Sequence, residues 1–199
     1  MNPAIPDGFT DLAPGKLASV VTFLELRQLP ALANSSPNPV RLRSVEHPDL
    51  DWYRALYRRA GAQWLWFSRL EMTDAQLSSV LNNPANELFL AEHDRSEVGM
   101  AELDRSHPPD VEITFFGLFP EAIGKRLGRP FMCALLHQAW QKSAARVWLH
   151  TCNLDAPAAL SFYMKCGFVP YKQAIEVADD PRIRGILPAD TAPHVPIIR

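Results

Sequence analysis

The chain has 199 residues, enough for one domain with a sizeable hydrophobic core. Its hydrophobic fraction of 47% and charged fraction of 21% are ordinary for a soluble globular protein. The formal net charge of −2 gives no reason to expect a nucleic acid as partner. The longest mostly apolar stretch, at 17–26, is too short to span a bilayer, so we expect no membrane partner either.

The chain start and the cysteines predict a cytoplasmic location. Residues 1–12 contain neither a basic segment nor an apolar one, so no secretory signal is visible. The three cysteines, Cys133, Cys152 and Cys166, are odd in number and form no CxxC pair, which is typical of reduced thiols in the cytosol.

The first half of the chain is predicted to form two strands and then two helices. Residues 18–26 and 40–45 are apolar and β-branched with a period of about two, which is typical of strands. Residues 50–59 carry apolar side chains at helical spacing. A second helix is expected to begin after Thr73, whose side chain forms a capping box with Gln76.

The second half alternates short strands with single helices. The predicted strands lie at 87–92, 98–103, 111–119, 146–152 and 168–177, and the predicted helices at 128–144 and 157–165. Asp155 is expected to cap the last helix, and Gly167 to end it. Strand runs mixed with single crossover helices predict an α/β or α+β fold built on a mixed sheet.

Both ends of the chain are rich in proline and are expected to be extended. The strand at 18–26 can complete the sheet within the chain or pair with a second copy, so the sequence leaves a homodimer open. The predicted organisation is an N-terminal arm with this extra strand at 1–38, a central domain at 39–178 and a C-terminal tail packed on that domain at 179–199.

A glycine-containing turn joins the strand at 111–119 to the helix at 128–144. Gly124 and Gly128 lie four residues apart, with basic residues between them. A helix N-terminus exposes unpaired N–H groups and the positive end of the helix dipole, so the junction can cradle a pyrophosphate. The turn matches neither a P-loop nor a Rossmann fingerprint.

The stretch 111–171 resembles the GCN5-related N-acetyltransferase (GNAT) family. It contains FGLFPEAIGKRLG at the junction and HTCNLDAPAALSFYMKCGF beyond it. A bacterial branch of the family carries similar FGLLPEFIGRGLG-like and TLDHPAALxxYxxxGF-like motifs, and the two motifs occur here in the same order at about the same spacing. The resemblance implies a mostly antiparallel sheet flanked by helices, with two splayed parallel strands at its centre.

The resemblance also implies an N-acetyltransferase. Acetyl-CoA would insert between the strands at 111–119 and 146–152, and a primary amine of a small molecule or peptide would attack it directly. The residues implied in binding acetyl-CoA are Leu118, Phe119, Ile123, Gly124, Lys125, Arg126, Leu127, Gly128, Arg129, Asn153, Asp155 and Phe162. A non-catalytic acyl-CoA-binding or regulatory module on the same fold is the alternative.

Two catalytic roles are carried over from the family. Tyr163 matches the tyrosine that protonates the departing thiolate, a reaction for which a phenol is suited at neutral pH. Glu112 matches a general base, which an amine needs because it arrives as ammonium. Glu102 and a chain of waters are the alternatives for the base.

Arg126 departs from the glycine that the family usually has. Arginine cannot adopt a positive φ cheaply. If the turn needs a glycine conformation there, cofactor binding would be impaired. We favour the alternative, an ordinary helix-entry backbone with the side chain adding charge near the 3′-phosphate of the cofactor.

Trp64 and Trp66 are candidate contacts for the acceptor, within an aromatic-rich segment that is otherwise expected to be core. No metal is expected, because the six histidines show no metal-ligand spacing. A hydrolase has no support, because Ser161 is not in a GxSxG motif. Cys152 is expected to be a buried structural thiol.

Overall fold

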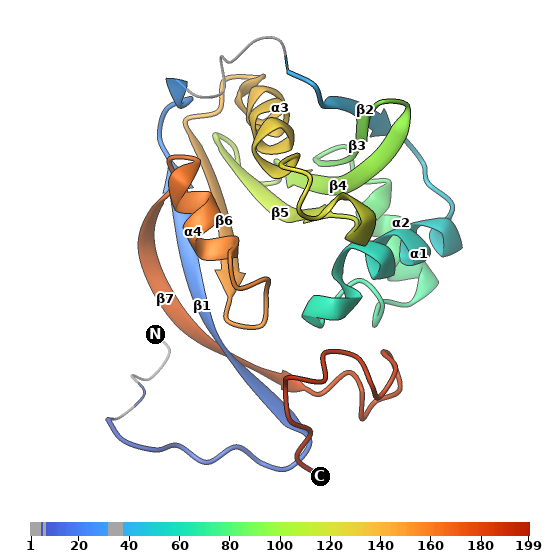
Figure 1. Cartoon of the computed structure of the whole chain (residues 1–199), viewed down its shortest axis with the longest axis vertical. Helices are drawn as coiled ribbons and strands as arrows, with labels where there is room; N and C mark the ends of the chain where they lie inside the picture. The colour runs from blue at the N-terminus through green and yellow to red at the C-terminus, as the bar shows by residue number, and fades with distance from the viewer. Residues whose placement is uncertain (1–4, 6, 32–37) are drawn as a thin grey trace.

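The computed structural model describes residues 5, 7–31 and 38–199. The parts of the predicted N-terminal arm at 1–4, 6 and 32–37 lie outside the described residues. Within the described part of the chain, one sheet runs through the whole molecule and helices cover it (Figure 1).

The sheet has seven strands among the described residues, in the order β2-β3-β4-β5-β6-β1-β7. All neighbours are antiparallel except β5 and β6, which are parallel. The predicted mixed, mostly antiparallel α/β architecture is therefore confirmed. The strands are β1 (Lys16–Leu26), β2 (Arg41–Val45), β3 (Asn86–His93), β4 (Ser96–Asp104), β5 (Asp110–Leu118), β6 (Arg146–Cys152) and β7 (Val169–Asp179).

The first strand settles how the N-terminal arm joins the fold. β1 lies between β6 and β7 of its own chain and is antiparallel to both (Figure 1). Val21 pairs with Cys152 on one side and with Ala174 on the other. Of the two pairings that the sequence left open, the structure has the one within the chain.

Two helices pack on each face of the sheet. The faces follow from the alternation of side chains along a strand: Ala101 and Leu103 of β4 join the core under α3, whereas Met100 joins the core under α1. The helices are α1 (Leu50–Gly61), α2 (Asp74–Leu81), α3 (Gly128–Trp140) and α4 (Ala159–Lys165), with short 3-10 turns η2 (Ala62–Trp64) and η3 (Pro120–Ala122). The capping box of Thr73 and Gln76 at the start of α2 is present as predicted.

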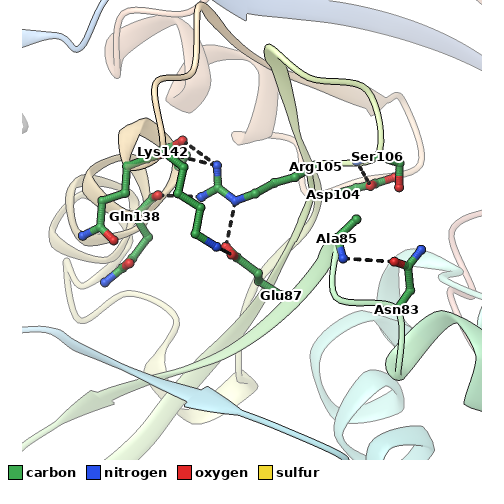
Figure 2. A network of polar contacts seen from close by, with 10 residues as sticks. Asn83, Ala85, Glu87, Asp104, Arg105, Ser106, Gln138 and Lys142 are labelled. Atoms are coloured by element: carbon green, nitrogen blue, oxygen red, sulfur yellow. Dashed lines mark hydrogen bonds and ion pairs between the residues drawn. The ribbon is translucent and has the colours of Figure 1, made fainter.

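Helix α3 ends four residues before its predicted end. Arg105, the residue directly after β4, donates hydrogen bonds to the carbonyl oxygens of Gln138, Ala139 and Gln141, and it pairs with Glu87 at 3.0 Å (Figure 2). These bonds satisfy carbonyls that a helix C-terminus leaves without a partner. A side chain from a distant strand therefore fixes this helix end.

The C-terminal tail folds back over the segment that follows α1. Leu187 and Ala192 are buried against Leu65. Arg182 has a side chain only 1% exposed, and it pairs with Asp180 and donates to the carbonyl oxygens of three tail residues. This buried arginine holds the tail in one conformation.

Candidate active site

The two parallel strands separate at the centre of the sheet. β5 and β6 pair only from Asp110 and Arg146 up to Glu112 and Trp148, although both strands run on beyond that point. The backbone of β5 therefore faces β6 across an opening wedge, with groups that no longer pair with that strand. The predicted splay of these strands is present in the structure.

The wedge opens into a cavity of about 800 Å³. Residues from both splayed strands line it, together with residues from α4, from the segment after α1, and from β1 and β7. Its volume is in the range of ligand sites in proteins. The predicted site residues that line it are Trp64, Trp66, Leu118, Ile123, Asp155, Phe162 and Tyr163.

The turn before α3 forms the basic junction beside the cavity. Gly124 has a positive φ of 82°, and a Cβ added there would meet nothing within 4 Å. Helix α3 begins at Gly128 with no side-chain cap among the described residues, so N–H groups of its first turn stay available to a ligand. Lys125 and Arg129 are exposed and form no ion pair within the described part of the chain. This geometry fits a phosphate-bearing cofactor.

Arg126 corrects one prediction. Its φ is 60°, in the left-handed region, so the expectation of ordinary helical backbone was wrong. The arginine takes the backbone conformation that favours glycine, and its side chain stays exposed. The turn keeps its shape at a conformational cost.

Leu127, which was implied in cofactor binding, is buried in the core under α3, and Phe119 and Asn153 also lie elsewhere. The N–H of Phe119 donates to the carbonyl oxygen of Val98, and its ring is buried in the core under α1. The side chain of Asn153 accepts a hydrogen bond from the backbone N–H of Val20 at 2.6 Å, which ties the end of β6 to β1. None of these three residues is among those that line the cavity.

Asp155 has a different role from the predicted one. Its carboxylate accepts hydrogen bonds from Thr151 Oγ1 at 2.7 Å, from the backbone N–H of Cys152 and from Trp66 Nε1. Helix α4 begins later than predicted, after Ala158, without a side-chain cap in the part of the chain described. The expectation that Asp155 caps it was therefore wrong. Asp155 instead fixes Trp66 against the end of β6.

Tyr163 projects from α4 into the cavity wall. It is 9% exposed and packs edge-on against Phe162, with ring centroids 5.4 Å apart. Burial raises the pKa of Tyr163 above its usual range, and the nearby charge of Asp155 adds to this. The phenol is therefore protonated at neutral pH and available as a donor.

Glu112 lies where the parallel pairing of β5 and β6 ends, and it does not line the cavity itself. Burial, and to a lesser extent the charge of Asp104, raise its pKa to about 7, and the charge of Arg69 opposes the shift. His150 lines the cavity, and its Nε2 lies 3.9 Å from a carboxylate oxygen of Glu112. The histidine thus both lines the cavity and lies next to Glu112.

Glu102, the alternative base, is fully engaged in the core. It is 3% exposed, its two carboxylate oxygens bind Tyr53 and Arg69, and it does not line the cavity. A carboxylate held between two donors away from the cavity is structural.

Sequence reasoning missed many of the lining residues, among them Ser19, His150 and Glu176. Ser19 and Glu176 pair across β1 and β7, two strands that are far apart in the sequence. Only the position of β1 in the sheet brings them to the cavity, and no local motif marks them. His150 was visible in the HTC motif, but nothing in the sequence placed Glu112 beside it.

Two further findings concern the described residues alone. They contain no group of three or more His, Cys, Asp or Glu side chains placed to hold a metal ion. Within the same residues, none of the helices has the length and apolar character needed to cross a membrane. Cys152 is half-buried and lines the cavity, so the expectation of a buried structural thiol was wrong; burial nevertheless raises the pKa of this thiol, which keeps it protonated rather than nucleophilic.

Comparison with known proteins identifies the family. The acetyltransferase (GNAT) family matches residues 50–168, so the chain belongs to the GNAT family. It is also similar to uncharacterized N-acetyltransferases of Mycobacterium bovis and Mycobacterium tuberculosis, each 32% identical over 102 residues. The match covers 51% of this chain and 65% of each relative, just under two thirds of their length. Family membership supports acyl transfer and does not favour a non-catalytic module.

Solved structures agree with the fold. A functionally unknown protein from Staphylococcus epidermidis superposes with a TM-score of 0.59 at 16% identity, over 83% of this chain and 64% of that one. A Bacillus subtilis acetyltransferase in complex with CoA gives a TM-score of 0.51 at 21% identity, over 65% of this chain and 76% of the other. At these identities the likeness concerns the fold alone.

Proposed function

We propose that the protein transfers an acetyl group from acetyl-CoA to a primary amine. The observation that carries the proposal is that β5 and β6 stop pairing at Glu112, and that the wedge opens into a cavity walled by Tyr163. The pantetheine arm would lie between the two strands, and the pyrophosphate at the basic turn before α3. A cytoplasmic location, which gives access to acetyl-CoA, belongs to the same proposal.

Each side chain then has a defined part in the reaction. Once the ammonium group has lost a proton, the amine nitrogen attacks the thioester carbonyl carbon, and N–H groups of β5 near Leu118 stabilise the oxyanion. Glu112 takes the ammonium proton through His150 or a water, because it does not reach the cavity itself. The C–S bond breaks, Tyr163 gives its proton to the CoA thiolate, and the second proton of the attacking nitrogen is released and restores the phenol through water. The products are the N-acetylated amine and CoA.

Thiol release from acetyl-CoA in the presence of a panel of primary amines tests the proposal. The Tyr163→Phe variant should lower kcat by about 100-fold, because general acid catalysis is lost, while its affinity for CoA stays near that of the unchanged protein. Tyr171→Phe, on the exposed strand β7, is the matched control and should be fully active. Equal activity of the two variants would rule out Tyr163 as the acid.

A further inference from the structure

The cavity has an aromatic wall whose rings hold one another in place. Tyr57, Trp66 and Phe115 all line it, with ring centroids between 5.0 and 5.6 Å apart. Trp66 is also fixed by its hydrogen bond to Asp155. Trp64 and Phe67 extend this wall. A preformed aromatic surface favours an apolar or aromatic ligand body, because no ordering is required on binding.

The charged groups of the lining are nearly all neutralised by protein partners. Arg69 pairs with Glu102 at 2.9 Å and lies over the ring of Phe115. Its Nε has no hydrogen-bond partner but is buried away from solvent, so it is closed to a ligand. Asp155 accepts its three hydrogen bonds from protein groups. Arg69 and Asp155 are therefore already compensated by protein groups, and neither offers an unpaired charge to a charged group of the acceptor.

Glu176 is the exception among the described lining residues. It lies on β7, is exposed, and forms neither a hydrogen bond nor an ion pair with any residue that the structure describes. Its partner across the sheet is Ser19, which is buried and also lines the cavity. Leu17 and Ala178, the pair beyond them, complete this second wall. The cavity therefore combines apolar walls with one uncompensated negative charge at its exposed edge.

We propose that the acceptor is a primary amine with an aromatic or branched apolar body and no carboxylate. The aromatic wall binds the body, and Glu176 attracts the ammonium group as it enters. An acceptor carboxylate would be repelled by Glu176, and the lining arginine, Arg69, is already paired with Glu102. A polyhydroxylated amine would lose hydration against apolar walls. This inference rests on the proposed acetyl transfer and names its acceptor class.

Binding without turnover tests the inference. Calorimetric titration of the CoA-saturated protein with phenethylamine should give an affinity about tenfold higher than with ethylamine, phenylalanine or an aminoglycoside. Phenylalanine differs from phenethylamine by the carboxylate alone, and ethylamine lacks the aromatic body. Equal or tighter binding of phenylalanine or of the aminoglycoside would overturn the inference.

Two variants separate the contribution of the aromatic wall, which contacts the apolar body of the ligand, from that of the Glu176 charge. Trp64→Ala should weaken phenethylamine binding about tenfold. Glu176→Gln should weaken it about fivefold at low salt and hardly at all at high salt, and should leave the binding of neutral phenethyl alcohol unchanged. Glu46→Gln, which removes an exposed carboxylate in the loop after β2, is the control. Unchanged CoA affinity in each variant shows that the fold is intact. An equal loss of phenethylamine affinity in Glu176→Gln and Glu46→Gln would overturn the role of Glu176.

The experiment also distinguishes this inference from the proposed function. Tight phenethylamine binding without thiol release would reject acetyl transfer and retain the binding preference. Thiol release with polar amines alone would retain transfer and overturn the acceptor class. Octanoyl-CoA that binds more tightly than acetyl-CoA and displaces phenethylamine would show that the aromatic wall holds an acyl chain, which also overturns it.

Discussion

At the scale of a single residue, Arg126 combines an unfavourable backbone conformation with a favourable charge. Its backbone is left-handed although it is not glycine, which costs about 1 kcal/mol. Its side chain is exposed beside Lys125 and Arg129, where a cation favours an anionic cofactor. Conformational cost and electrostatic gain therefore fall on the same residue.

Two variants separate these effects. Arg126→Gly and Arg126→Ala both remove the charge, but only glycine relieves the positive φ. The glycine variant should therefore have a free energy of unfolding about 0.5–1 kcal/mol higher than the alanine variant, measured by urea denaturation. Both should weaken CoA binding to a similar small extent. An alanine variant as stable as the glycine variant would contradict the argument.

The role of Glu112 as base predicts that kcat/KM depends on pH. A base must be unprotonated, and burial together with Asp104 raises the pKa of Glu112 to about 7, so its active form increases as pH rises through that value. The kcat/KM should rise with a midpoint of about 7, with His150 as the neighbouring titratable group on β6. Asp104→Asn should move this limb to lower pH, and Glu112→Gln should remove it. An unchanged profile in Glu112→Gln would exclude it as the base.

At the scale of elements, the tail supports the wall that carries Trp64 and Trp66. Leu187 and Ala192 pack on Leu65, next to both tryptophans in the chain. Arg182 and Asp180 hold the tail in place as a buried pair with exposed fractions of 1% and 2%. The tail does not line the cavity, so its influence on an acceptor acts through this wall.

Removing the buried arginine tests that influence. Arg182→Met leaves Asp180 buried without its partner, a change that typically costs about 3–5 kcal/mol, so the tail should detach. The KM for the acceptor should rise about fivefold or more, and CoA affinity should stay the same. Arg184→Ala, which breaks the exposed pair with Glu71, should cost under about 1 kcal/mol and leave KM unchanged. Equal effects of the two variants would contradict the role of the tail.

Local signals predicted the elements well, and long-range contacts decided their ends. The capping box at Thr73 lies within one helical turn, so the sequence alone indicated the start of α2. The end of α3 depends on Arg105, which lies 33 residues away from Gln138 in the chain (Figure 2). No period or motif near residue 140 contains that information.

At the scale of the whole molecule, the position of β1 decided what could be foreseen of the site. The junction at 116–128 and the motif at 150–168 indicated the family and the wedge, because both are continuous in sequence. Ser19 and Glu176 join the cavity only because β1 inserts between β6 and β7. The residues that β1 and β7 bring to the cavity were therefore beyond sequence reasoning, whereas the wedge between β5 and β6 was indicated by motifs that are continuous in the chain.

Calorimetric titration with acetyl-CoA tests the central claim most directly. The unchanged protein should bind it with micromolar affinity, and Lys125→Glu and Arg129→Glu should each weaken binding about tenfold, because each reverses a charge at the start of α3. Arg199→Glu, at the C-terminus on the opposite side of the molecule from α3 (Figure 1), makes the same charge change and should have no effect. No binding by the unchanged protein, or equal weakening by all three variants, would contradict an acyl-CoA site in the wedge.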